Sequence, residues 1–335
     1  MPIRGNATLR AALTPARTGV AALAVAAAVL MTTLGGWDPG GPGRPDRPRP
    51  VRQAHGPERD IPLAPGCDEK NPARSLQHPS AEDGPAVRAI ARSGKIVIGV
   101  DQNTYHWGYR DPASKQLQGF DIELARTLVK EIFGADFTVE FKAVATNDRI
   151  DALKGHDIDM VVRTMTIDCR RQSEVAFSTA YFGAQQKILA GKETPVGSAG
   201  DLRGKKVCAA EESTGSKWVK EHLPGARLVQ VPNQLDCLVR LQLGEAVAVV
   251  TDDTLAAAQA AQDPTVQVKR YPEDSAVEPY GVAMRKEDTD LVARVNQVLD
   301  TYRDGGGWEA ARKRWLAKDG LAVTEPPAAQ YASKD

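Results

Sequence analysis

The chain lacks the short motifs that mark the common catalytic sites. It contains no G-x-S-x-G, no P-loop and no H-E-x-x-H, so hydrolase, phosphate-loop and zinc-peptidase chemistry is not indicated. Histidine is scarce, with five residues scattered at positions 55, 78, 106, 156 and 222. We therefore expect a protein that is not an enzyme, with no catalytic residue, no metal and no cofactor.

Net charge is also absent, since 43 basic residues balance 43 acidic ones. The balance is uneven along the chain. Residues 1–60 hold eight Arg and four acidic residues, which leaves 35 basic and 39 acidic residues in the remainder. A weakly acidic body has no broad positive field for a phosphate backbone, so nucleic acid is not an expected partner.

Cysteine is rare, and its spacing excludes the usual zinc sites. Cys67, Cys169, Cys208 and Cys237 form no C-x-x-C pair and no Cys/His cluster. An even count in an exported chain favours two disulfides. Because Cys208 lies in a strand-like run and Cys237 in the following helix-like segment, we favour the pair Cys208–Cys237. That choice leaves Cys67–Cys169, although other pairings and free buried thiols stay open.

The N-terminus is typical of an export segment. Arg4, Arg10 and Arg17 precede an uncharged run at residues 19–34 that is rich in Ala and Val. The run is slightly short for a membrane span but could still anchor the chain. We predict that residues 1–35 are a cleaved signal or an uncleaved anchor, and both alternatives place the rest outside the cytoplasm.

Two segments carry too few apolar residues to form a core. Residues 36–80 begin with a stretch dominated by Pro, Gly and Arg, and we predict a disordered tether there, with its last part lying over the surface if Cys67 is bonded. Residues 321–335 are predicted to be a disordered tail.

Between these segments, strand-like and helix-like patterns alternate. Regular structure is expected to begin at Lys95 with KIVIGV, a run rich in β-branched residues. GFDIELARTLVKEIFG has near-helical apolar spacing and ends at Gly134, and FTVEFKAV, RIDALKG and IDMVVRT follow as strand, helix and strand. A second series runs KKVCAA, STGSKWVKEHL, ARLVQV, QLDCLVRLQLG, AVAVV and DTLAAAQAAQ. This alternation predicts an α/β protein with mainly parallel sheets.

The polar stretch GKETPVGSAGDLRG separates the two series and predicts two lobes. We expect the first lobe to span residues 81–190 and the second 191–278. The strand PYGVAMRK and helices near 290–303 and 308–316 then return to the first lobe over residues 279–320.

Several segments in order resemble a known family. IVIGVDQNTYHWGYRDP, GFDIELA, VVRTMTIDCRR, DLRGKKVCAAEESTGS, AVVTDD and EPYGVAMRK are similar to family-3 solute-binding proteins of polar amino-acid ABC importers. VVRTMTIDCRR and PNQLDCLVRLQ resemble the actinobacterial glutamate/glutamine-binding branch in particular. The resemblance covers about residues 94–320. It implies a periplasmic-binding-protein type II fold, with two α/β lobes that are joined by two crossover strands and close over one amino acid.

The resemblance also implies roles for residues of the first lobe. Arg171, six residues before the Phe of AFS, matches the Arg that binds the ligand's α-carboxylate, whose geometry suits a planar guanidinium. Its neighbour Arg170 stands at a position that is more often acidic and is expected on the surface. Thr164 and Thr166 resemble residues whose backbone and hydroxyl groups complete the contacts to the carboxylate and the amine.

From the second lobe, Asp252 matches the family acid that meets the α-ammonium, while Asp253 is expected to face away or to cap the next helix. Thr214, Gly215 and Ser216 lie at a strand-to-helix junction, where free N–H groups attract an anion. By resemblance these three residues contact the ligand.

The signs for the ligand's side chain conflict. Arg149 resembles an Arg that faces a side-chain carboxylate, which favours Glu or Asp, because a buried cation without an anion is costly. Asp101 stands at a selectivity position where an acid favours an amide, and Glu211 adds negative charge nearby. Tyr105 and Trp107 are expected to pack over the aliphatic part of the ligand, with a role in the lobe core as the alternative.

The resulting hypothesis is a monomeric binding protein that delivers a polar amino acid, glutamate or glutamine or a relative of them, to the membrane permease of an ABC importer. Two alternatives use the same fold. One is an amino-acid sensor that signals to a membrane partner. The other is a dehydratase, for which Glu211 or Asp101 would have to serve as the general acid.

Overall fold

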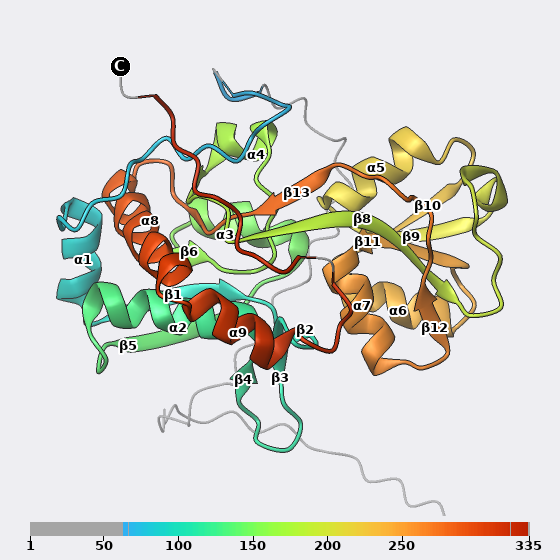
Figure 1. Ribbon diagram of the computed structural model, residues 1–335, viewed down its shortest axis with the longest axis horizontal. Coiled ribbons are helices and arrows are strands. Elements are labelled where there is room, and N and C mark those ends of the chain that lie inside the picture. Colours follow the sequence, from blue (N-terminus) through green and yellow to red (C-terminus); the bar gives the residue numbers. More distant parts are fainter. Residues whose placement is uncertain (1–62, 66, 322, 334–335) are drawn as a thin grey trace, which may run out of the picture. The chain divides into compact units, whose positions relative to one another are not determined.

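The computed structural model describes residues 63–65, 67–321 and 323–333. The predicted export segment, residues 1–35, and most of the predicted tether lie outside these residues. Among the residues described, no helix is both long and apolar enough to cross a membrane. Two sheets, each with helices packed around it, account for most of this part of the chain (Figure 1).

The first sheet has the strand order β5-β1-β6-β14-β7. Strands β5, β1 and β6 are parallel, and β14 runs antiparallel to both of its neighbours. Its strands are β1 (Lys95–Val100), β5 (Thr138–Ala143), β6 (Met160–Val161), β7 (Ala176–Phe177) and β14 (Ala283–Met284). The helices of this lobe are α1 (Pro85–Ser93), α2 (Phe120–Phe133), α3 (Arg149–Lys154), α4 (Cys169–Glu174), α8 (Thr289–Asp304) and α9 (Gly307–Trp315), with a 3-10 turn at Thr146–Asp148. A small antiparallel sheet joins β2 (Asn103–Thr104), β3 (Gly108–Arg110) and β4 (Leu117–Gln118).

The second sheet has the order β10-β9-β11-β8-β12. Strands β10, β9 and β11 are parallel, and β8 is antiparallel to β11 and β12. The strands are β8 (Phe182–Gly191), β9 (Lys206–Ala210), β10 (Arg227–Val231), β11 (Ala248–Asp252) and β12 (Val266–Val268). The helices are α5 (Thr214–His222), α6 (Gln234–Gln242) and α7 (Asp253–Gln262), with a 3-10 turn at Ala199–Leu202.

Two strands connect the lobes. The first half of β8 pairs antiparallel with β13 (Val277–Tyr280), and its second half belongs to the second sheet (Figure 1). After β13 the chain enters β14 of the first sheet. The predicted two-lobed α/β class with two crossover strands is therefore confirmed. The sheets are mixed, because the strands next to each crossover run antiparallel to the parallel core.

The spacing of apolar residues accounts for the helices that were predicted. Helix α2 begins after Gly119 and ends before Gly134, both of which have positive φ. Ile122, Leu124 and Leu128 are buried in the core of the first lobe. Burial of each such side chain contributes about 1.5–3 kcal/mol, which exceeds the weak intrinsic stability of a 14-residue helix.

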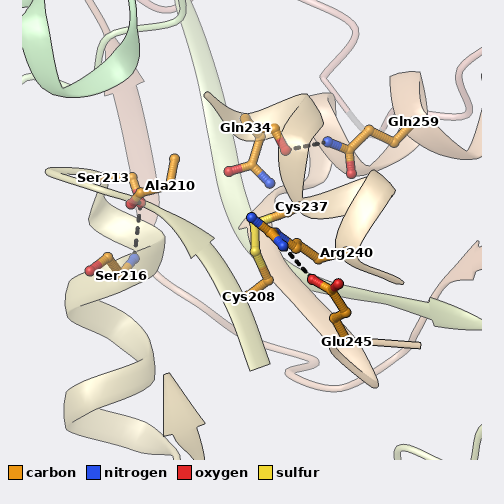
Figure 2. Close-up of a disulfide and its surroundings, with 9 residues drawn as sticks. All are labelled: Cys208, Ala210, Ser213, Ser216, Gln234, Cys237, Arg240, Glu245 and Gln259. Atoms are coloured by element: carbon orange, nitrogen blue, oxygen red, sulfur yellow. Dashed lines mark hydrogen bonds and ion pairs between the residues drawn. A yellow bond between two sulfur atoms is a disulfide. The ribbon is translucent and has the colours of Figure 1, made fainter. Parts of the chain in front are cut away.

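Both favoured disulfides are present. Cys208 in β9 is bonded to Cys237 in α6, and Cys67 is bonded to Cys169 at the start of α4 (Figure 2 shows the first). No cysteine of the described chain is free. The second bond joins residues 102 apart in sequence and ties the segment before α1 to the helix that carries Arg171.

Regular structure begins earlier than predicted, because α1 precedes Lys95. Pro85 at the helix start provides the φ angle that a first turn needs. The N–H groups of Ala86 and Val87 are accepted by the Asp290 carboxylate of α8, at 3.4 and 3.0 Å. This cap comes from a residue about 200 positions away, which local pattern does not reveal.

Residues 67–80 lie against the first lobe and are held by the Cys67 disulfide, as expected if Cys67 is bonded, and residues 323–333 of the predicted tail also make specific contacts there. Ser75 forms a parallel bridge with Tyr331, whose hydroxyl donates to the Asp300 carboxylate of α8. The His78 ring stacks on Tyr331, and Asn296 donates to Ser75 Oγ at 2.9 Å. Polar contacts to a folded lobe therefore order segments whose composition is poor in apolar residues.

Candidate functional site

A narrow cavity that is partly open to solvent lies between the two lobes. Eight of the eleven predicted site residues line it. From the first lobe these are Asp101, Arg149, Thr164, Thr166 and Arg171, and from the second Thr214, Gly215 and Asp252. Segments more than 150 residues apart in sequence thus meet at one site, as the two-lobed prediction requires.

Arg171 forms part of the first-lobe wall and is 2 % exposed. Its helix, α4, begins at the Asp168 N-cap, whose carboxylate accepts the Arg171 N–H at 2.7 Å. In the side chain, Nη1 donates to the Thr166 carbonyl at 2.7 Å and Nη2 to the Glu212 carbonyl at 2.8 Å. The guanidinium is therefore held in one orientation by both lobes, with donors left for a carboxylate fork.

Arg170 points elsewhere. Its Nη1 lies 3.1 Å from Glu212 Oε2, and both side chains are substantially exposed to solvent. An ion pair of this kind contributes little to stability. The structure thus separates the two adjacent arginines: Arg171 borders the cavity, and Arg170 does not.

Two further arginines border the cavity beside Arg171. Arg163 is 3 % exposed, donates to Thr146 Oγ1 at 3.0 Å, and lies 3.1 Å from the carboxylate of Asp101. Arg149 donates only to carbonyl oxygens, those of Thr146 at 2.9 Å and Arg163 at 3.4 Å. Burial and the neighbouring arginines hold the pKa of Arg149 well below its usual value. Arg149 is thus a buried cation with no carboxylate partner among the described residues.

Thr164 has a left-handed backbone, with φ of 40°, which is unusual for a β-branched residue. Its N–H is accepted by Asp121 Oδ2 at 2.9 Å, and the Tyr181 hydroxyl donates to Asp121 Oδ1. Burial raises the pKa of Asp121 to about 7. This turn ends the strand predicted over IDMVVRT after only Met160–Val161 and brings the next residues to the cavity.

Asp252 ends β11 and forms the opposite wall. Its Oδ1 accepts from Gln186 Nε2 at 2.6 Å, and its Oδ2 accepts from the Tyr280 hydroxyl. Burial, and next the charge of Glu278, raise the pKa of Asp252 to about 8, whereas Arg171 is close enough to act in the opposite direction. The adjacent Asp253 accepts the N–H of Thr254 in α7 at 2.8 Å and the N–H of Gln185 in β8 at 3.1 Å.

Helix α5 contributes its N-terminus. Ser213 caps it by accepting the Ser216 N–H at 3.0 Å (Figure 2). The N–H groups of Thr214 and Gly215 have no acceptor among the described residues, so they remain free for an anion. A Cβ at Gly215 would lie 2.9 Å from the Val250 carbonyl, so only glycine allows the helix to approach β11 this closely.

Three predicted residues do not line the cavity. Ser216 accepts from Gln230 Nε2 at 2.9 Å, so its side chain faces β10. Trp107 is fully buried in the first-lobe core, edge-on to Phe182 at 4.9 Å. Tyr105 packs against its neighbour His106, with ring centroids 3.8 Å apart. For Trp107 the structure thus favours the core alternative.

Several polar residues at or near the cavity were missed by the sequence analysis. Arg163, Thr146 and Gln234 line it, and Gln186 and Glu278 lie just behind the wall on the crossover strands. Arg163 could have been suspected as a charge inside the strand-like run IDMVVRT. The described residues contain no His, Cys, Asp or Glu cluster suited to a metal.

Comparison with known proteins agrees with this geometry. The model of the bacterial extracellular solute-binding proteins, family 3, matches residues 96–318. The glutamine-binding protein GlnH of a Bacillus subtilis ABC transporter is 32% identical over 77% of this chain and 93% of its own length. The glutamate-binding protein GluB of Corynebacterium efficiens is 26% identical over 73% of this chain and 86% of its own length.

Among solved structures, an ancestral arginine-binding protein bound to glutamine is 32% identical, with a TM-score of 0.63 over 67% of this chain and 99% of the other. These relatives are binding proteins and not enzymes. The family model covers well over half of the chain and begins and ends within the described lobes. The chain therefore belongs to the bacterial extracellular solute-binding proteins, family 3.

Proposed function

We propose that the protein binds a polar amino acid in the cavity between its lobes and delivers it to the permease of an ABC transporter. The observation that carries this proposal is the placement of the Arg171 guanidinium and the Asp252 carboxyl group on opposite walls of one cavity. Arg171 is available to an α-carboxylate on one wall, and Asp252 is available to an α-ammonium on the other. The free N–H groups of Thr214 and Gly215 add donors for the carboxylate.

Closure of the lobes follows from the same contacts. Arg171 binds the Glu212 carbonyl, and the Thr146 N–H binds the Pro232 carbonyl at 3.1 Å, so each lobe already contacts the other. A ligand that touches both walls stabilises the closed form by its differential affinity. A permease can then distinguish the closed protein from the open one.

The charges around the cavity favour glutamate as the ligand. Asp101 is neutralised by Arg163, and Asp168 lies 3.4 Å from Arg171, but Arg149 has no carboxylate partner. A ligand with a second carboxylate supplies the missing anion. The two acids that argued for an amide ligand carry less weight, since Asp101 is paired and Glu211 accepts from Asn147 at 3.0 Å without lining the cavity.

Names of relatives support the same class of ligand and partner. One is the glutamine-binding protein of an ABC transporter, and another is a glutamate-binding protein. We infer that the protein acts outside the cytoplasm, in keeping with its family and with the basic and apolar pattern of residues 1–35.

Calorimetry with the purified protein and the twenty amino acids tests this proposal. We expect a dissociation constant of order micromolar for glutamate, about −8 kcal/mol, with weaker binding of glutamine and aspartate. Absence of heat with glutamate, glutamine, aspartate and asparagine would refute the ligand class. A strongest response to glutamine would refute the preference for a second carboxylate.

A further inference from the structure

A carboxylate on the second crossover strand lies directly behind the cavity wall. Glu278 in β13 does not line the cavity, but its Oε2 accepts from Thr166 Oγ1 at 2.9 Å and from Thr214 Oγ1 at 2.6 Å. Its Oε1 accepts from Gln186 Nε2 at 2.9 Å. One side chain therefore contacts a first-lobe hydroxyl, a second-lobe hydroxyl and an amide of the other crossover strand.

These contacts determine whether the Thr166 and Thr214 hydroxyls donate or accept hydrogen bonds at the cavity. A threonine hydroxyl carries one hydrogen and two lone pairs, and an ionised carboxylate can only accept. Because Thr166 and Thr214 each give their hydrogen to Glu278, only lone pairs remain for the cavity that both residues line. Gln186 Nε2 lies 3.2 Å from Thr214 Oγ1, but its two hydrogens point to the closer oxygens of Asp252 and Glu278, so it does not supply a hydrogen to Thr214 in place of a ligand.

The neighbouring polar groups are acceptors as well. Asp252 is held by Gln186 and Tyr280, which are neutral donors. The Gln186 Oε1 atom is buried and has no hydrogen-bond partner in the described chain. No lysine or arginine of the described residues forms an ion pair with Asp252 or Glu278. This corner of the cavity thus presents oxygen atoms backed by the Glu278 carboxylate, and no ion pair with a lysine or arginine of the described residues occupies it.

We propose that Glu278 is a positioning residue that orients the Thr166 and Thr214 hydroxyls as acceptors and so makes this corner specific for the α-ammonium of the ligand. The inference rests on the proposed function and adds a residue to it. The position of this corner also defines how the amino acid lies in the cavity. The ammonium lies toward the crossover strands, and the carboxylates lie toward Arg171 and Arg149.

The test compares glutamate with glutarate, which has the same two carboxylates but no ammonium. The amide of Glu278→Gln has two possible orientations. If its oxygen faces the two hydroxyls, its NH₂ group faces the NH₂ group of Gln186, and two donors oppose each other. If its nitrogen faces the hydroxyls, both hydroxyls must accept from it and turn their hydrogens toward the cavity. We expect the affinity for glutamate to fall about 30- to 100-fold and that for glutarate to change less than about threefold. Glu273→Gln, the same change at an exposed position five residues earlier, should alter neither affinity.

A second variant separates hydroxyl orientation from charge alone. Thr166→Val with Thr214→Val keeps the Glu278 charge but removes both hydroxyls, and the ratio of glutamate to glutarate affinity should fall at least about tenfold. Adding Glu278→Gln to this background should then cost less than about threefold further, because the two act through one contact set. This comparison also holds if the single Glu278 variant folds poorly.

Two results would overturn the inference while leaving the proposed function intact. One is an unchanged ratio of glutamate to glutarate affinity in Glu278→Gln, or an equal loss for both ligands. The other is persistence of the full Glu278→Gln effect in the double valine background, which would mean that Glu278 acts by charge alone. A wild-type protein that binds none of the polar amino acids would instead overturn the proposed function and this inference together.

Discussion

Replacing Arg149 with glutamine should change which amino acid the protein prefers. The Arg149 side chain is 4 % exposed and donates only to carbonyl oxygens, so no carboxylate of the described chain forms an ion pair with it. If the ligand's side-chain carboxylate supplies that anion, the variant loses an ion pair with glutamate. With glutamine it loses at most one charge-assisted hydrogen bond.

The size of the effect follows from Coulomb's law. Two unit charges about 4 Å apart attract by about 4 kcal/mol at an effective dielectric constant of about 20. Truncation of one partner of a buried charge pair costs about 2–5 kcal/mol in measured interfaces. We therefore expect the affinity for glutamate to fall about 30- to 1,000-fold, and that for glutamine less than about tenfold.

Calorimetry with both ligands on wild type and Arg149→Gln measures this ratio. Arg126→Gln, the same change on the exposed face of α2, is the matched control and should leave both affinities unchanged. The ligand-free variant should melt at or slightly above the wild-type temperature, because it no longer buries an unpaired cation. An equal loss for glutamate and glutamine would refute the assignment of Arg149 to the ligand's side chain.

Three further predictions concern the binding arginine, a disulfide and pH. Arg171→Ala should weaken amino-acid binding at least about 100-fold in calorimetry, whereas Arg170→Ala, which removes an exposed ion pair, should change it less than about threefold; equal effects would contradict the separation of the two arginines. Cys67→Ser with Cys169→Ser opens a loop of about 100 residues and should lower the free energy of unfolding by about 4 kcal/mol, measured by urea titration. An unchanged midpoint of urea unfolding would exclude such a contribution. Burial and a neighbouring carboxylate raise the pKa of Asp252 to about 8. The folded protein therefore keeps a proton that the unfolded chain releases near pH 4. The free energy of unfolding of the ligand-free protein should consequently fall as pH rises between about 4 and 8. The ligand's ammonium favours the ionised form of Asp252, so binding of glutamate should release the Asp252 proton and the affinity should rise from pH 6 to 8. Calorimetry in buffers of different ionisation enthalpy measures this proton release. Asp252→Asn should abolish it.

Features that depend on short stretches of chain were predictable. The apolar spacing in GFDIELARTLVKEIFG and its final glycine correspond closely to α2. Cys208 and Cys237 were paired because a strand and a helix of the same α/β series pack together, and the structure confirms the bond, although α5 and β10 separate β9 from α6. Arg171 is buried and its neighbour Arg170 is partly exposed. This agrees with the family position of Arg171, six residues before the Phe of AFS.

Features that depend on distant partners were missed or misassigned. Helix α1 is capped by Asp290, and the segment around Tyr331 is ordered by Asp300, so neither carries a local signal. Trp107 was expected over the ligand but fills the core, because an aromatic side chain after a strand can face either way. The pattern of one segment does not determine that choice.

The fold class and the order of the two lobes follow from the periodicity and order of the segments along the chain. The expectation that Arg171 and Asp252 face the same ligand came from the resemblance to the family. Which charges neutralise one another depends on the tertiary structure: Asp101 pairs with Arg163, and Arg149 is left without an acid among the described residues. The tertiary structure likewise decided that Glu278 faces hydroxyls from both lobes. Such pairings depend on distances of about 3 Å between side chains from separate elements, and those distances exist only once both lobes and their crossover strands have packed.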